Sequence, residues 1–247
     1  MTTAIFCFNA RLNRFLAMEH RAHAFSRRCA RHASVKHMVE ALGVPHTEVG
    51  LVVVNGAAST LDAAIGDGDR IDVFPWGPAC LAPNSNDPYA GTPRFVADSH
   101  LGALARLLRM TGFDTLYDNC YDDAELAALA CREHRIVLTR DRELLKRRVV
   151  RLGCHVDAIE PREQLVEVHR RFDLRGRMRP LSRCLGCNVT FRRVDKRDVL
   201  DRLPERVIAR HDAFFVCDAC ERIFWEGTHW VNMRQLIDRL VGSAHEK

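Results

Sequence analysis

The stretch RFVADSHLGALARLLRMTGFDT, residues 94–115, decides the expected fold of the central part of the chain. The short apolar run at 95–97 predicts a strand that ends at Asp98. A helix should begin at once, because leucine and alanine recur at helical spacing over residues 101–108. Asp98 then has two interpretations. Either it caps the helix by accepting hydrogen bonds from free backbone amides, or it is the first ligand of an acidic metal site.

The alternation of strands and helices continues to about residue 175. Further strands are predicted at 114–117, 135–139 and 154–160, and helices at 122–134, 141–148 and 161–172. Alternating elements with short connections predict a parallel sheet, so this part of the chain is assigned to the α/β class. Such sheets bind ligands beyond the carboxyl ends of their strands.

Acidic residues follow three of the predicted strands. Asp98 follows the first, Asp122 and Asp123 open the helix after the second, and Asp141 follows the third. Carboxylates gathered at one sheet edge repel one another unless a cation lies between them, and Mg²⁺ or Mn²⁺ takes such hard oxygen ligands. Helix capping is the alternative for each of these residues. Their coincidence at three strand ends favours the metal site, and the chain has no phosphate-binding loop or nucleophile elbow.

Arginine supplies all but four of the 37 basic residues, and the net charge is +5. Guanidinium groups fork onto phosphates and stack on bases, so the bias favours a nucleic-acid partner, although a GC-rich genome would also produce it. Arg106, Arg109 and Arg140 lie near the acidic positions and are candidate substrate-binding residues. For Arg106 and Arg109, which lie away from the apolar face of their helix, a solvated surface is the alternative.

Four of the ten cysteines fall in two tight pairs, CLGC at 184–187 and CDAC at 217–220. Two C-x-x-C pairs separated by a few tens of residues are typical of a structural Cys₄ zinc site. Such a site would hold one Zn²⁺ on Cys184, Cys187, Cys217 and Cys220. The remaining cysteines are scattered singly, which favours reduced thiols and a reducing compartment.

The first 80 residues predict a small α+β domain. Strands are expected at 5–8, 50–54 and 71–74, with an Asn-Gly turn after the second, and a helix at 34–45. Residues 81–93 are rich in Pro, Asn and Gly and are predicted to be a linker. No run approaches the ~20 apolar residues of a membrane span, and the N-terminus lacks the order of a signal peptide. A cytoplasmic protein without membrane contact is therefore expected.

Several of these stretches resemble one bacterial family. FVADSHLGALARLLRMTGFDT, YDDAEL and RIVLTRDRELLKRR resemble the Mut7-C RNase domain, a branch of the PIN-like nucleases, and CLGCNVTF, FFVCDAC and FWEGTHW resemble its zinc-ribbon end. GVPHTEVGLVVVNG and GDGDRIDVFP are similar to the ubiquitin-like β-grasp domain that precedes it, a relative of the small sulfur carriers. The resemblance implies a β-grasp domain at 1–80, a linker at 81–93, a PIN-like parallel-sheet nuclease domain at 94–175 and a zinc ribbon at 176–247.

The resemblance also implies an activity, that of a divalent-metal-dependent ribonuclease. Its acidic site carries over onto Asp98, Asp123 and Asp141 as Mg²⁺ or Mn²⁺ ligands, with Asp122 as a cap or an auxiliary ligand. The fourth acid of many PIN nucleases has no unambiguous match, although Asp157 and Glu160 are candidates for that position. The partner would be RNA, with tRNA or another structured RNA among the candidates. A toxin-like role, RNA maturation and RNA turnover all fit.

Two other functions stay open at this point. A catalytically inactive RNA-binding adaptor would bind RNA and leave it whole, so divalent-dependent cleavage separates it from a nuclease. A sulfur-carrier-like partner, acting through the N-terminal domain, is disfavoured because the last strand runs into PWGPACLAPNSNDP and not into a Gly–Gly tail. A docking role with a protein partner suits that domain better.

Overall fold

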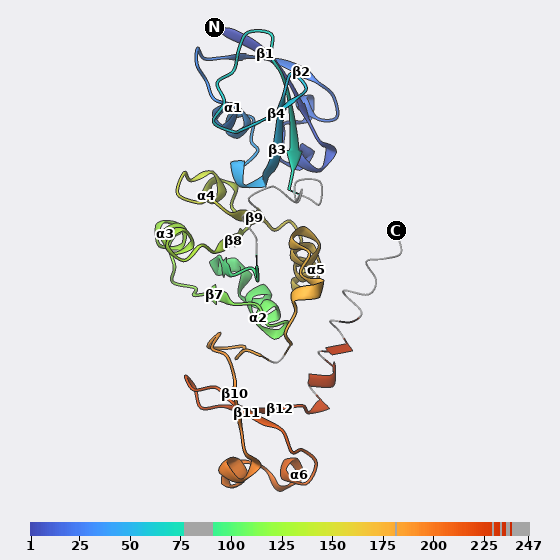
Figure 1. Cartoon of the computed structure of the whole chain (residues 1–247), viewed down its shortest axis with the longest axis vertical. Coiled ribbons are helices and arrows are strands. Elements are labelled where there is room, and N and C mark those ends of the chain that lie inside the picture. The colour runs from blue at the N-terminus through green and yellow to red at the C-terminus, as the bar shows by residue number, and fades with distance from the viewer. Residues whose placement is uncertain (77–90, 181, 229, 233, 236–237, 239–247) are drawn as a thin grey trace. The chain divides into compact units, whose positions relative to one another are not determined.

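A computed structural model describes all residues except 77–90, 181, 229, 233, 236–237 and 239–247 (Figure 1). Most of the predicted linker, residues 81–90, lies outside the described residues. The chain forms two compact units. One combines residues 1–90 with 121–155, and the other combines 91–120 with 156–247. The domain boundaries predicted from the sequence stay predictions.

The N-terminal part folds as a five-stranded sheet with one α-helix, as predicted for a β-grasp domain (Figure 1). The strand order is β2-β1-β5-β3-β4, in which β1 and β5 pair in parallel and the other neighbours are antiparallel. The elements are β1 (Thr2–Phe8), β2 (Phe25–Cys29), α1 (Val35–Ala41), β3 (Val49–Val54), β4 (Ala57–Ser59) and β5 (Arg70–Pro75). Short 3₁₀ helices lie at Ala10–Phe15, Met18–His20 and His46–Glu48.

Sequence periodicity explains why these elements form. Alternate residues of β1, among them Phe6, point into a core that α1 covers with its apolar stripe. The hydroxyl of Ser34 accepts a hydrogen bond from the amide of His37 at 3.2 Å and so begins the helix. Asn55 and Gly56 both have positive φ, 51° and 83°, which closes the β3–β4 hairpin with a tight turn.

Residues 121–155 pack with the β-grasp sheet in one unit. They form α3 (Asp123–Glu133), β8 (Ile136–Thr139), α4 (Arg142–Lys146) and β9 (Gly153–His155). Strands β8 and β9 are parallel, with Thr139 opposite His155. The strand predicted at 154–160 is therefore shorter than expected, since the amides of Asp157 and Ala158 donate to the carboxylate of Glu167 and not to a neighbouring strand.

The second unit contains the other parallel pair and the C-terminal region. Strand β6 runs parallel to β7, with Ala97 opposite Tyr117, and α2 packs on α5. This part comprises β6 (Phe95–Ala97), the 3₁₀ helix Ser99–Leu101, α2 (Gly102–Met110), β7 (Thr115–Tyr117), α5 (Pro161–Phe172) and the 3₁₀ turn Arg175–Arg177. Both parallel pairs confirm the predicted α/β class.

The C-terminal region has a small sheet of its own. Three antiparallel strands in the order β10-β11-β12 surround a core of four buried side chains, Val199, Val207, Phe214 and Val216. The elements are β10 (Arg192–Val194), the 3₁₀ helix Lys196–Arg202, α6 (Glu205–Ile208), β11 (Phe214–Val216) and β12 (Ile223–Trp225). So few buried side chains rarely stabilise a domain without a metal or disulfide. Every helix in the described residues is too short or too polar to cross a lipid bilayer.

A buried histidine makes the second unit sensitive to acid. His169 of α5 is 8% exposed, packs edge-on against Phe113, and has no hydrogen-bond partner for either ring nitrogen among the described residues. Burial lowers the pKa of His169 to about 4, whereas an unfolded histidine titrates near pH ~6.5. Between these values the unfolded chain binds the proton more readily, so stability falls as pH falls through this window.

We expect His169→Phe to remove this sensitivity. When the pH is lowered from 7 to 5, the wild type should lose about 2 kcal/mol more of its free energy of unfolding than the variant does. At pH 7 the variant should be slightly more stable, because two buried polar atoms without partners are gone. Urea unfolding at both pH values measures the difference. Parallel losses in the two proteins would contradict a neutral, buried His169.

Candidate functional site

Asp98 lies directly after β6 and caps the 3₁₀ helix that follows. Its Oδ1 accepts hydrogen bonds from the amide of Ser99 at 2.6 Å and from the Ser99 hydroxyl at 3.1 Å. The side chain is half-buried, at the carboxyl end of a fully buried strand. Capping by Asp98 is therefore confirmed, and it fixes the carboxylate at the end of the strand.

Asp122 and Asp123 begin α3, and they have different local roles. Asp122 is the N-cap of a complete capping box: its Oδ1 accepts from the amide of Glu125 at 2.8 Å, and Glu125 accepts from the Asp122 amide at 3.1 Å. Asp123, one residue later, forms an ion pair with Arg147 at 3.2 Å in which both side chains are largely exposed. An exposed pair of this kind contributes little to stability.

Asp141 occupies the same kind of position after β8. The backbone amide of Asp141 donates to the hydroxyl of Thr139 at 2.9 Å. The Oδ1 atom of Asp141 accepts from the amide of Glu143 at 2.8 Å, and this bond caps α4. Among the described contacts, Oδ2 of Asp141 has no hydrogen-bond partner. A cap of this form leaves one carboxylate oxygen for another ligand, so capping and cation binding are compatible at this residue.

The two candidates for a fourth acid both lie after β9. Asp157 is exposed and follows the last residue of β9 by two positions, as Asp141 follows β8. Glu160 is the N-cap residue of α5 without a side-chain capping bond.

The candidate arginines separate into two kinds. Arg106 and Arg140 are exposed, which leaves their charges accessible to a phosphate. Arg109 is only 5% exposed, so its predicted place on an open helix face is wrong. Its guanidinium donates to the carbonyl oxygens of Thr115 at 2.8 Å, Leu185 at 3.0 Å and Gly186 at 2.7 Å. Arg109 therefore fixes the cysteine-containing loop to α2 and β7. Because its guanidinium is buried and engaged there, it is not available to bind a substrate.

Burial lowers the pKa of Arg109, and the nearby sulfurs of Cys184 and Cys187 oppose this effect. Asn188 further fixes the loop. Its side-chain oxygen accepts from the backbone amide of Thr115 at 3.0 Å, and its side-chain nitrogen, Nδ2, donates to the carboxylate of Asp114 at 2.7 Å. These contacts connect the first cysteine pair to the end of α2 and the start of β7.

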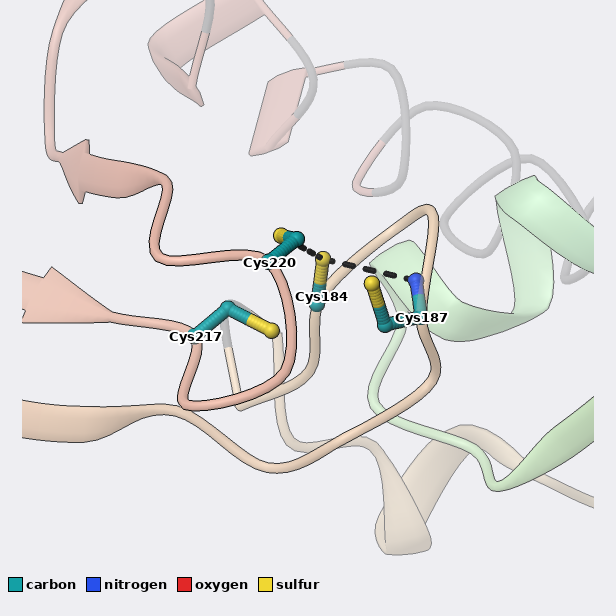
Figure 2. A group of neighbouring side chains, drawn as sticks. All are labelled: Cys184, Cys187, Cys217 and Cys220. Atoms are coloured by element: carbon teal, nitrogen blue, oxygen red, sulfur yellow. Dashed lines mark hydrogen bonds between the residues drawn. The ribbon is translucent and has the colours of Figure 1, made fainter.

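The four paired cysteines come together as predicted (Figure 2). Their sulfur atoms all lie within 4.8 Å of one another, and Cys184 and Cys220 are 3.8 Å apart. A tetrahedron with Zn–S bonds of about 2.3 Å has sulfur atoms about 3.8 Å apart, so the group could hold a zinc ion. The amide of Cys187 also donates to the sulfur of Cys184 at 3.5 Å, which orients that sulfur.

Without a cation, these thiols compete for protons. Contact with Cys220 and burial raise the pKa of Cys187 to about 12, and a backbone amide at Arg222 lowers the pKa of Cys220 to about 7. Four thiolates so close together require a positive charge between them. The other cysteines in the described part of the chain are free thiols, in agreement with the sequence.

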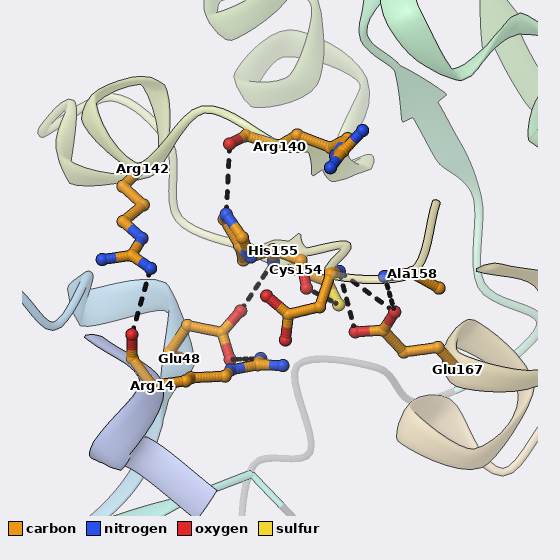
Figure 3. Close-up of polar contacts among 9 residues, drawn as sticks. Arg14, Glu48, Arg140, Arg142, Cys154, His155, Ala158 and Glu167 are labelled. Atoms are coloured by element: carbon orange, nitrogen blue, oxygen red, sulfur yellow. Dashed lines mark hydrogen bonds and ion pairs between the residues drawn. The ribbon is translucent and has the colours of Figure 1, made fainter. Parts of the chain in front are cut away.

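A polar contact between the β-grasp part and β9 was not predicted (Figure 3). Glu48 is fully buried; its carboxylate accepts from the amide of His155 at 2.7 Å and pairs with Arg14 at 3.4 Å. The ring of His155 packs against Phe15, and its Nε2 lies 3.1 Å from the carbonyl oxygen of Arg140. The contact therefore extends from the first domain to the residue before Asp141. A charged residue inside the apolar stretch GVPHTEVGLVVV was the signal for it.

Replacing Glu48 by Ala should destabilise the protein by about 3 kcal/mol, because one partner of a buried polar pair is lost. Glu143→Ala is the matched control: Glu143 also pairs with a cation, Lys146, but its side chain is 78% exposed. Its loss should cost less than about 0.5 kcal/mol. Urea unfolding of both variants measures the contrast. Equal, small losses would show that the Glu48 contact does not stabilise the fold.

Comparison with known families accounts for almost the whole chain. The model of the Mut7-C RNAse domain matches residues 93–237, and the model of the Mut7-C ubiquitin domain matches residues 1–80. A search of curated proteins found no match.

Two solved structures align with 30% of this chain and 98% of their own length, each with a TM-score of 0.25. They are small archaeal modifier protein 1 from H. volcanii, at 19% identity, and a putative molybdopterin converting factor, subunit 1, from Pyrococcus furiosus, at 17% identity. The first family model spans more than half of the chain, so this protein belongs to the Mut7-C RNAse domain family and carries a Mut7-C ubiquitin domain before it.

Proposed function

We propose that this protein is a cytoplasmic, divalent-metal-dependent ribonuclease with a PIN-like active site. Membership of the Mut7-C RNAse domain family is the observation that carries the proposal. The positions of Asp98 after β6 and Asp141 after β8 support it. Both carboxylates lie at the carboxyl ends of parallel strands, and each is held there because it accepts a hydrogen bond from a backbone amide as a helix N-cap.

The local geometry of the acids supports a separate role for each. In this proposal Asp98 and Asp141 hold Mg²⁺ or Mn²⁺, and Asp123 completes the ligand set or orients the attacking water. Asp122 is the cap of α3, and in this proposal it is at most an auxiliary ligand. A bound divalent cation would lower the pKa of nearby water and offset negative charge on the phosphate.

The substrate in this proposal is RNA, with tRNA and other structured RNAs as the first to test. Arg140 directly precedes Asp141 and is exposed, which supports a role in binding the phosphate next to the scissile bond. Arg106 is a second exposed cation, on the helix that follows Asp98.

The other parts of the chain would support this site. One structural Zn²⁺ on the four cysteines would stabilise the ribbon. Arg109 and Asn188 would then hold the cysteine-containing loop against α2 and β7 through their hydrogen bonds. The β-grasp part would stabilise β9 through Glu48 and leave its remaining surface for a protein partner.

RNA-end sequencing tests the activity. Purified, zinc-loaded protein is incubated with total RNA, with and without added Mg²⁺ or Mn²⁺, and new ends are mapped. A nuclease should create new ends only with the added cation. RNA that is bound but left whole under every condition would favour the inactive adaptor.

A further inference from the structure

The C-terminal region contains a cavity of about 520 Å³ that the acidic residues do not use. Aromatic rings form much of its wall, from Phe191, Phe224, Trp225 and Trp230, and Arg206 and Arg210 also line it. No aspartate or glutamate is among the described residues that line it. The volume lies within the range of about 300–1,000 Å³ that is usual for small-molecule sites.

Local packing holds the rings in place. Phe191 and Phe224 have centroids 4.4 Å apart, and Trp225 packs on the small core of the ribbon. Gly227 lies beside the indole of Trp225, where a Cβ would come within 2.7 Å of Nε1. Any larger residue at 227 would have to displace that ring, so the glycine preserves the wall of the cavity.

The described residues that line the cavity include three arginines and no carboxylate. Arg206 and Arg210 form no ion pair with the described residues, and Arg183, a third lining arginine, donates only to the neutral carbonyl oxygens of Gly112 and Asn188. Two acids of the ribbon form ion pairs with other residues, Asp218 with Arg192 and Asp212 with Lys196. A ligand that matches this cavity is anionic and has a flat apolar face.

We propose that this cavity binds one unpaired nucleotide of an RNA strand. The base would stack on the aromatic wall, and its phosphate would lie at Arg206 and Arg210, which is the way proteins bind single strands. Bases of an A-form duplex are stacked on each other and cannot enter such a site. An apolar peptide would leave the arginine charges unmatched. The inference rests on RNA being the substrate, as proposed above.

The cavity and Asp98 lie at opposite ends of the same helix. Met110, the last residue of α2, lines the cavity, whereas Asp98 precedes the start of this helix by a few residues. Nine helical residues span about 14 Å. A nucleotide bound in the cavity would therefore fix the distance along the RNA strand between that unpaired base and the phosphodiester bond that is cleaved.

The test is a binding titration with a fluorescein-labelled single strand of uridines and a blunt-ended, fully paired RNA duplex. All variants carry Asp98→Asn and zinc, without added Mg²⁺ or Mn²⁺, so cleavage does not enter. Trp230→Ala should weaken single-strand binding about 5-fold to 150-fold, the loss expected for one stacking aromatic, and leave duplex binding unchanged. Trp230→Phe should retain most of the affinity, because a ring remains.

Arg210→Ala probes the phosphate contact. It should reduce the salt dependence of single-strand binding, with the slope of log K against log salt smaller by about 0.7. Arg197→Ala is the matched control, since Arg197 is exposed on the same ribbon and does not line the cavity. Zinc content and circular dichroism verify that each variant is folded.

Photocrosslinking locates the base directly. A strand that carries 5-bromouridine should crosslink to residues 223–230 in the Asp98→Asn protein. Crosslinks only in other peptides, or equal loss of single-strand and duplex binding in Trp230→Ala, would overturn the assignment. These results do not depend on cleavage, so a failed nuclease assay with positive binding would refute the proposed activity alone.

Discussion

Asp98→Asn and Asp141→Asn should each lower the rate of RNA cleavage by about a thousandfold while the protein stays folded. A metal ion contributes several kcal/mol to the stabilisation of transition-state charge, and each 1.36 kcal/mol is about a factor of ten in rate. Asparagine is as good an N-cap as aspartate, so both caps should survive the substitution. Loss of one negative charge should leave the melting temperature of the metal-free protein unchanged or raise it.

Asp118→Asn is the matched control for this experiment. Asp118 directly follows β7 as Asp98 follows β6, and its Oδ1 accepts from the amide of Cys120 at 2.9 Å. It is exposed and plays no part in the proposed site. Cleavage of a labelled RNA under single-turnover conditions should be normal in Asp118→Asn. Full activity in both Asp98→Asn and Asp141→Asn would mean that the proposed acidic site does not catalyse cleavage.

Loss of zinc should unfold the C-terminal ribbon. Structural zinc contributes about 10–16 kcal/mol to small metal-bound domains, and the apolar core in the described part of the ribbon consists of four buried side chains. Cys217→Ser, at a fully buried position, should therefore abolish zinc binding and make the chain sensitive to proteases after about residue 180. Elemental analysis and limited proteolysis measure both effects.

Cys120→Ser is the control for the zinc experiment, because Cys120 is an exposed free thiol outside the cluster. It should retain about one zinc per chain. The prediction fails if reduced, freshly purified protein contains no zinc, or if Cys217→Ser keeps a protease-resistant ribbon.

Local signals in the sequence predicted much of this architecture. Period-two and helical patterns located most strands and helices, and the spacing of CLGC and CDAC predicted which cysteines meet. The caps at Asp98 and Asp141 were also readable, because an aspartate between a strand and a helix has few other conformations available. Short edge strands were missed: β2 contains Ser26, Arg27 and Arg28, which carry no strand-like apolar pattern.

Long-range contacts could not be predicted in the same way. A helical pattern places Arg109 away from the apolar stripe, but only the folded chain brings Leu185 and Gly186, more than 70 positions later, over its guanidinium. The Glu48–His155 bond likewise joins residues 107 positions apart. Such contacts depend on which surfaces meet in three dimensions, and no local pattern in a single sequence specifies that.

The central claim is that a divalent cation on the strand-end acids cleaves RNA, and one rate measurement tests it most directly. Zinc-loaded wild-type protein is freed of other divalent ions by dialysis without chelator, and cleavage of a labelled structured RNA is followed as Mg²⁺ or Mn²⁺ is added. The rate should rise from background and saturate with the cation, and Asp98→Asn should stay at background throughout. A cation-independent rate, or a saturating rise of equal size in Asp98→Asn, would contradict the account.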